Sequence, residues 1–263
     1  MKPEDLLKEG KLNEALKALM EQVRSGPSDA PLRVFLFQLM ALMGQWERAL
    51  NQLKVSGELD RLNNLLVGVY VHALHGELKR HVVFSGLQTP LVIGEPTQWM
   101  AWLFEALKTQ IGGRCEQAMA LRLEAFDQAE ALGGTIDGVP FDWIADGDTR
   151  FGPCLEIILN KGYFWVPFSR IREIKFEKPS DLRDKVWAAV EVTWDNGGQV
   201  IGFIPSRYPG SECSEDHEIV LARKTEWQDI GNDCFVGFGQ RMLTTNAGDY
   251  PLLDIRSITF NLD

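Results

Sequence analysis

A short pattern that recurs in the first half of the chain restricts its fold more than any other sequence feature. The sequence GKLNEAL at residues 10–16 returns 34 residues later as GQWERAL at 44–50. A third copy, GRCEQA at 113–118, begins 69 residues after the second, close to two more periods. A glycine can end one helix in the left-handed conformation, after which the next helix begins. A period of about 34 residues is typical of the tetratricopeptide helix–turn–helix, so we predict stacked helical pairs.

Prolines and glycines indicate where the helices of this half begin and end. We interpret Gly76 as a helix break, and residues 86–96, which contain two prolines, as a loop, because proline disrupts a helix interior. Gly133 and Gly134 end the last helix. These features predict a TPR-like α-α superhelix over residues 1–134. Its helices are expected at residues 30–43, 46–55, 59–74 and 118–132, with another that starts at residue 97.

The second half changes to short β-branched and aromatic runs separated by turn residues. Asn196-Gly197, between runs at 188–194 and 199–205, is the strongest short hairpin pattern. A second turn at 160–162 separates two further runs. Short strands and tight turns predict a small, mainly antiparallel β-rich (α+β) domain over residues 135–263, so the chain is expected to be multidomain. Other strands are expected at residues 171–176, 218–222, 234–238 and 254–260.

The charge of the chain argues against several classes of partner. Its net charge is −10, and residues 135–263, with 13 basic and 21 acidic side chains, hold −8 of it. Such a surface repels phosphate groups, so we predict no nucleic-acid partner and no binding to anionic membranes. No run approaches the ~18–20 apolar residues of a membrane helix, and the N-terminus lacks the apolar core of a secretory signal. The cytoplasm is therefore the expected location.

The four cysteines do not predict a metal site or a disulfide framework. They lie at residues 115, 154, 213 and 234, so no two form a CxxC pair of the kind that binds zinc. Free and mostly buried thiols are expected in a reducing compartment.

An acidic segment at residues 142–156 is the one candidate for catalytic chemistry. Asp142, Asp146, Asp148 and Glu156 could hold a hard cation, because Ca²⁺ and Mg²⁺ prefer carboxylate oxygens. The spacing does not match an EF-hand, and Asp and Gly also favour turns for local reasons. Arg150 could neutralise one carboxylate as an internal ion pair. We favour a structured turn or interdomain hinge, and keep a metal-dependent hydrolase as the alternative.

Other catalytic patterns are missing from the sequence. It has no Gly-x-Ser-x-Gly elbow, and Gly237-Phe-Gly239 lacks the length and the lysine of a phosphate-binding loop. We therefore predict a protein that is not an enzyme and needs no cofactor. Two polar, turn-rich segments at 207–212 and 239–256 could form a binding surface or the corners of a sheet held by Arg–carboxylate pairs, and we favour the second.

The helical half is the predicted interaction surface. Helical-repeat proteins bind peptides or helices on a concave face, and few repeats leave only a short groove that suits one helix or strand. Ordinary packing remains the alternative for every apolar position in these helices. From periodicity alone, the predicted partner-binding residues are Phe35, Gln38, Trp46, Trp99 and Trp102.

Several motifs taken together resemble the ImpE family, also known as TagJ. The motifs are GDTRFGPCLE at 147–156, GYFWVPF at 162–168, DLRDKVW at 181–187, RYPG at 207–210, RKTEW at 223–227 and GQRMLTT at 239–245. The resemblance extends through essentially the whole chain. It implies a cytoplasmic, non-enzymatic accessory factor of a type VI secretion system. It further implies binding to the N-terminal helix of the sheath subunit TssB and a link to sheath recycling by the ATPase ClpV, but it supplies no binding residues.

Overall fold

The three copies of the N-terminal pattern form the same local structure in the computed structural model, which describes residues 1–160, 162–231 and 234–262. Gly10, Gly44 and Gly113 have φ angles of 73°, 68° and 78°, in the left-handed region that favours glycine. The alanine five positions after each glycine is fully buried. The glycine therefore turns the chain, and the small alanine lets the next helix pack closely.

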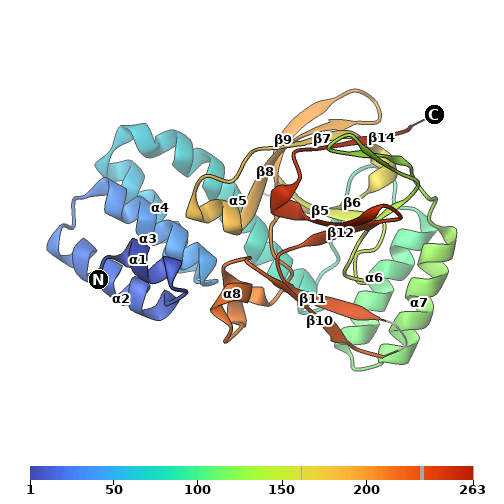
Figure 1. Ribbon diagram of the computed structural model, residues 1–263, viewed down its shortest axis with the longest axis horizontal. Helices are drawn as coiled ribbons and strands as arrows, with labels where there is room; N and C mark the ends of the chain where they lie inside the picture. The colour runs from blue at the N-terminus through green and yellow to red at the C-terminus, as the bar shows by residue number, and fades with distance from the viewer. Residues whose placement is uncertain (161, 232–233, 263) are drawn as a thin grey trace.

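Seven helices precede most of the strands. From α1 to α5, each packs against the next, whereas α6 and α7 pack against each other at the opposite end of the molecule (Figure 1). N-terminal helices are therefore confirmed, but they do not stack as one continuous row. None of the helices in the described part of the chain is long and apolar enough to cross a membrane. Their bounds are α1 Pro3–Lys8, α2 Leu12–Ser25, α3 Ala30–Leu42, α4 Trp46–Leu59, α5 Asn64–Phe84, α6 Gln98–Ile111 and α7 Cys115–Gln128.

A nine-stranded sheet forms the centre of the second half, in the order β1-β6-β5-β9-β8-β7-β14-β2-β3. Its pairings are antiparallel except for β1 with β6. A three-stranded sheet, β13-β12-β4, and a two-stranded sheet, β10-β11, lie beside it. The predicted mainly antiparallel sheet is thus confirmed. The bounds are β1 Leu91–Val92, β2 Gly134–Ile136, β3 Val139–Phe141, β4 Ile144–Asp146, β5 Cys154–Leu159, β6 Gly162–Pro167, β7 Ile171–Phe176, β8 Trp187–Trp194, β9 Gln199–Pro205, β10 Thr225–Asp229, β11 Phe235–Gly239, β12 Met242–Thr245, β13 Gly248–Pro251 and β14 Ser257–Phe260.

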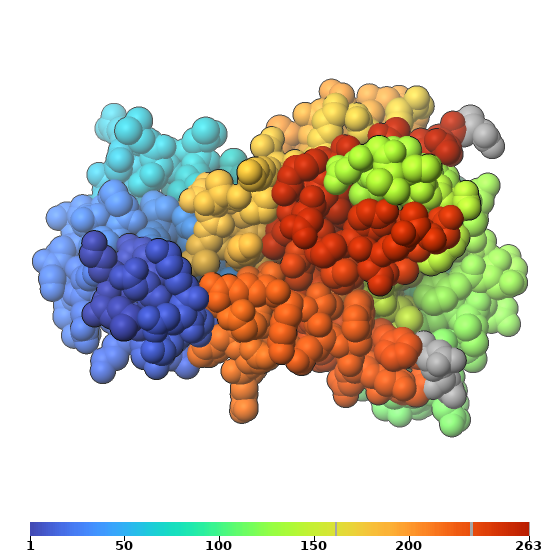
Figure 2. All heavy atoms as spheres, in the orientation of Figure 1, coloured from blue at the N-terminus to red at the C-terminus, as the bar shows by residue number. Residues whose placement is uncertain are grey.

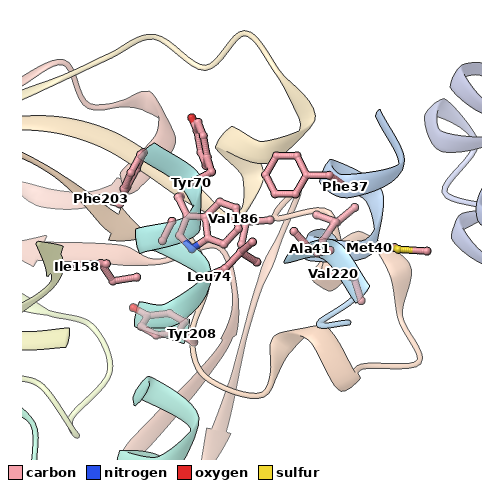
Figure 3. Close-up of a cluster of buried hydrophobic side chains, with 14 of the residues drawn as sticks. Phe37, Met40, Ala41, Tyr70, Leu74, Ile158, Val186, Phe203, Tyr208 and Val220 are labelled. Atoms are coloured by element: carbon pink, nitrogen blue, oxygen red, sulfur yellow. The ribbon is translucent and has the colours of Figure 1, made fainter. Parts of the chain in front are cut away.

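One hydrophobic core joins the helices to the sheet. Phe37 of α3, Tyr70 of α5 and Phe203 of β9 belong to the same buried cluster (Figure 3). The Tyr70 ring lies 5.9 Å from that of Phe37 and 5.1 Å from that of Phe203, measured between centroids. Burial of aromatic surface contributes strongly to stability. This core contains residues from both sides of residue 134, the predicted domain boundary. The division itself stays a prediction.

Gly76 does not break a helix, which corrects the sequence interpretation. Helix α5 continues through it to Phe84, and Gly76 lies where this helix packs against β5. A Cβ atom at this position would lie 2.5 Å from Cγ2 of Ile158. The glycine is therefore required by the close approach of helix and strand.

The expected strand at residues 218–222 is also wrong. His217–Val220 form the short helix α8, because the Asp216 side chain accepts a hydrogen bond from the Glu218 backbone N–H and caps it. The predicted loop at 86–96 contains the two-residue strand β1. The hairpin at Asn196-Gly197 is confirmed, with Gly197 at a φ of 83°. The other predicted turn includes Lys161, which lies outside the described residues.

Cations from the second half of the chain cap the C-termini of two N-terminal helices. Arg207 donates a hydrogen bond of 2.8 Å to the carbonyl oxygen of Leu42, at the end of α3. Arg223 donates hydrogen bonds of 3.1 Å and 3.3 Å to the carbonyl oxygens of Leu7 and Lys8, at the end of α1. Helix C-termini carry unpaired carbonyls and a partial negative charge, so these contacts are favourable. In Figure 2, the orange part of the chain, which includes residues 217–223, lies against the dark-blue N-terminal residues.

The left-handed glycines yield a first prediction. Gly113→Ala should lower the free energy of unfolding by about 1–2 kcal/mol, because only backbone strain is added and no atom lies within 4 Å of the new Cβ. Gly44→Ala should cost more, because its Cβ would lie 2.6 Å from Cγ of Glu212. Urea denaturation of both variants measures the difference. Equal losses would show that the Glu212 side chain moves aside without cost.

Candidate functional site

A buried network of charges lies where α5 meets the sheet, and Glu156 of β5 is its centre. Arg80 of α5 makes a two-pronged contact with Glu156, with nitrogen–oxygen distances of 2.7 and 2.9 Å. Arg241 and the Tyr163 hydroxyl also donate hydrogen bonds to this carboxylate. Glu156 and Arg241 are fully buried. The side chain of Glu156 therefore holds the helix and two separate segments of the sheet region together.

Two more buried carboxylates continue the network. Asp146 of β4 pairs with Arg241 and accepts a hydrogen bond of 2.9 Å from the Tyr208 hydroxyl. Asp148 pairs with Arg150 and accepts a hydrogen bond of 2.9 Å from the Gly237 backbone N–H. These contacts confirm the expected ion pair at Arg150 and, in the segment 239–256, an Arg–carboxylate pair at Arg241. Arg207 of the segment 207–212 donates to backbone carbonyls instead.

Burial controls the electrostatics of the network. It raises the pKa of Glu77, which lies beside Arg80, and raises the pKa of Asp146 to about 6, while the neighbouring arginines act in the opposite direction. Burial also lowers the pKa of Arg241. Since removing ions from water is costly, the pairing of each carboxylate with a guanidinium is what allows these groups inside the protein.

The acidic cluster is not arranged to hold a cation. Asp146, Asp148 and Glu156 all point their oxygens at arginines, a tyrosine or backbone N–H groups. Asp142 is exposed and bonds to Asn246 instead. Within residues 1–160, 162–231 and 234–262, no group of three or more His, Cys, Asp or Glu side chains could bind a metal ion. The metal-dependent hydrolase has no support from this geometry.

A cleft of about 290 Å³ opens onto the network between α5, α6 and residues 209–213. Arg80 and Arg150 line it, together with Glu77 and Glu212. The Arg150 guanidinium carbon also lies 5.2 Å from the centroid of the Phe84 ring, on the cleft wall. Charges of both signs beside an apolar wall suit a polypeptide segment better than an isolated anion.

The five predicted partner-binding residues do not share one groove. Phe35 and Gln38 of α3 line a second cavity, of about 490 Å³, whereas Trp46 lines the cleft. Trp99 and Trp102 of α6 are partly buried and pack against the hydrophobic core. Their role in binding stays a prediction.

The residues of the site with the most contacts were not predicted from the sequence. Arg80 and Glu77 lie in a helix with no recognisable motif, and apart from each other their side-chain partners Glu156 and Trp187 are 76 and 110 residues away in sequence. Arg207 and Arg241 were visible only within the motifs RYPG and GQRMLTT. Arg80 lies in the charged run Glu77-Leu-Lys-Arg-His81, which carries no local sign that Glu77 and Arg80 are buried.

Comparison with known proteins places this arrangement in a defined class. The model of the ImpE protein family matches residues 138–259. The type VI secretion system accessory component TagJ of Pseudomonas aeruginosa is 49% identical over 257 residues, covering 98% of this chain and 90% of that protein. The X-ray crystal structure of protein VPA1032 from Vibrio parahaemolyticus superimposes with a TM-score of 0.90 at 25% identity, covering 99% of this chain and 98% of the other. This chain and VPA1032 therefore share one fold along their length, in which N-terminal helices pack on a mainly antiparallel sheet. This chain belongs to the ImpE (TagJ) family.

Proposed function

We propose that this protein is a non-enzymatic accessory component of a type VI secretion system. The observation that carries the proposal is the 49% identity to TagJ along 98% of the chain. At the finer level, we propose that it binds the N-terminal helix of the sheath subunit TssB and takes part in ClpV-dependent sheath recycling in the cytoplasm, as the family resemblance implies.

The cavity at Phe35 and Gln38 is the proposed contact for the partner helix. It lies between α1, α3 and residues 180–182, and its volume of about 490 Å³ can admit several side chains. Helices commonly bind by laying an apolar face into a groove. The repeated helix–glycine–helix geometry supports a TPR-like reading of residues 1–134, with residues 135–263 as a second part that positions them.

A pull-down with the purified full chain tests the proposal. We expect it to retain intact TssB and to lose most binding when the N-terminal helix of TssB is deleted. Val34→Asp, which places a charge in the cavity, should weaken binding by about tenfold, since an unpaired charge would be desolvated. Val139→Asp is the matched control, because Val139 is 45% exposed and lies in β3, outside the cavity.

Three outcomes would contradict different parts of the proposal. Retention of TssB without its N-terminal helix would exclude the proposed mode of binding. Equal binding by the Val34→Asp and Val139→Asp variants would move the contact away from this cavity. Absence of any binding to TssB would remove the proposed partner.

A further inference from the structure

The cleft between α5, α6 and residues 209–213 contains a guanidinium nitrogen that the buried network does not use. Nε and Nη2 of Arg150 both donate to the Asp148 carboxylate, at distances of 2.5 to 3.0 Å. Arg150 is 8% exposed and lines the cleft. Among the residues that the structure describes, no acceptor lies within hydrogen-bonding distance of its third nitrogen, Nη1. Arg150 is therefore held in place by one carboxylate and can still donate to a second.

Glu212 brings a carboxylate without a direct cationic partner to the same cleft. Over the described residues 1–160, 162–231 and 234–262, no Lys, Arg or His nitrogen lies within 4.0 Å of its oxygens. The buried Arg207 attracts it from farther away: burial lowers the pKa of Arg207, and the charge of Glu212 acts in the opposite direction. The cleft therefore offers an anion as well as a donor to an incoming molecule.

Much of the remaining wall is apolar, and the cleft is small. Trp46, Phe84, Leu107 and Ile111 line it, and Gln110 lies among them. The side-chain oxygen of Gln110 accepts a hydrogen bond from a neighbouring arginine, so its amide N–H groups can donate to a ligand. Sites for small molecules are concave and mostly apolar, with a few polar groups that fix orientation. The volume of about 290 Å³ lies just below the ~300–1,000 Å³ of sites for drug-sized ligands, so the occupant is smaller than those.

We infer that this cleft binds a free amino acid with an apolar side chain. The carboxylate of the amino acid accepts hydrogen bonds from Arg150 and Gln110, its ammonium group pairs with Glu212, and its side chain packs on the apolar wall. A simple anion would leave Glu212 unmatched, and a residue inside a polypeptide has neither of the two backbone charges. The inference does not rest on the proposed binding of the sheath, which uses a different cavity.

Leucine and three of its analogues test the inference by isothermal titration calorimetry with the full chain. 4-Methylpentanoic acid lacks the ammonium group, 3-methylbutylamine lacks the carboxylate, and N-acetyl-leucine amide lacks both charges, as a residue within a polypeptide does. We expect leucine to bind at least about tenfold more tightly than each analogue, because a missing charge leaves a polar group of the site unpaired. Equal or tighter binding of any analogue would overturn the inference, and for the amide it would identify a polypeptide segment as the occupant. Absence of leucine binding at about 10 mM would also overturn it.

A charge-removing variant locates the ammonium group. Glu212→Gln keeps the volume of the side chain and should weaken leucine binding by about tenfold, so that leucine loses its advantage over 4-methylpentanoic acid. Glu215→Gln is the matched control, because Glu215 is exposed and does not line the cleft. It removes the same charge from the same loop and should change the affinity for leucine less than about twofold. Equal losses in the two variants would contradict the assignment of Glu212.

Cys213 gives a readout that needs no variant. Its thiol is exposed and lines the cleft, whereas Cys115, at the start of α7, is partly exposed and lies outside the cleft. Because alkylation requires access to the sulfur, leucine should slow the reaction of Cys213 with iodoacetamide in proportion to the occupied fraction. The rate at Cys115 should not change, and mass spectrometry follows both. Unchanged alkylation of Cys213 at leucine concentrations that saturate the calorimetric signal would place the amino acid elsewhere and overturn the inference.

Discussion

Glu156→Gln is expected to lower the free energy of unfolding by about 3–5 kcal/mol, because removing one partner of a buried ion pair leaves an uncompensated charge. Glutamine preserves the volume of the side chain, so the change tests the charge itself. Arg80 and Arg241 would both lose a buried negative partner that now lies within hydrogen-bonding distance of them. Urea denaturation at pH 7 measures the loss.

Glu173→Gln is the matched control for this prediction. Glu173 pairs with Lys175 at 3.1 Å, but the two side chains are 31% and 56% exposed. Ion pairs at the surface typically contribute 0–1 kcal/mol, so we expect a change below about 1 kcal/mol. Similar losses in the two variants would show that the charge network around Glu156 does not hold α5 on the sheet.

Gly76→Ala and Gly68→Ala are expected to change stability in opposite directions, although both lie in α5. At an open helical position, alanine is favoured over glycine by up to ~1 kcal/mol, and no atom lies within 4 Å of a Cβ at Gly68. At Gly76, the Cβ would lie 2.5 Å from Ile158, a buried and stiff β-branched side chain. We expect a loss of about 1–3 kcal/mol from overpacking.

The rescue variant identifies the cause of the loss. Ile158→Ala alone should destabilise by about 2–5 kcal/mol through a cavity. Combined with Gly76→Ala, it should cost less than the sum of the two single changes, because the clash disappears and the new methyl group occupies part of the cavity. Additive losses, measured as free energies of unfolding, would show that the helix and strand do not compete for this space.

The sequence predicted best what depends on neighbouring residues. The hairpin at Asn196-Gly197 and the turns at Gly10, Gly44 and Gly113 require positive φ angles, which local composition reveals. The strand expected at 218–222 failed for a local reason too, since the cap supplied by Asp216 outweighed the β-branched run. Gly76 failed because the reason for it, Ile158, lies 82 residues away in the sequence.

The site was predictable only in part, for the same reason. Arg150 and Asp148 are two residues apart, so their pairing could be proposed from the sequence. The pairing of Glu156 with Arg80 joins residues 76 positions apart, and that with Arg241 joins residues 85 positions apart. Side chains brought together by α5 crossing the sheet leave no local pattern, so the acidic cluster could be recognised as structural without its partners being named.

The capping of early helices by late arginines has a consequence for how the chain acquires its structure. The carbonyl of Leu7 receives its hydrogen bond from Arg223, 216 residues later, and that of Leu42 from Arg207, 165 residues later. During synthesis, domains generally fold as they emerge, N-terminal end first. Here the first helices leave the ribosome long before the residues that complete their ends. Final docking must therefore wait for almost the whole chain, which makes folding dependent on contacts between distant residues and correspondingly slow.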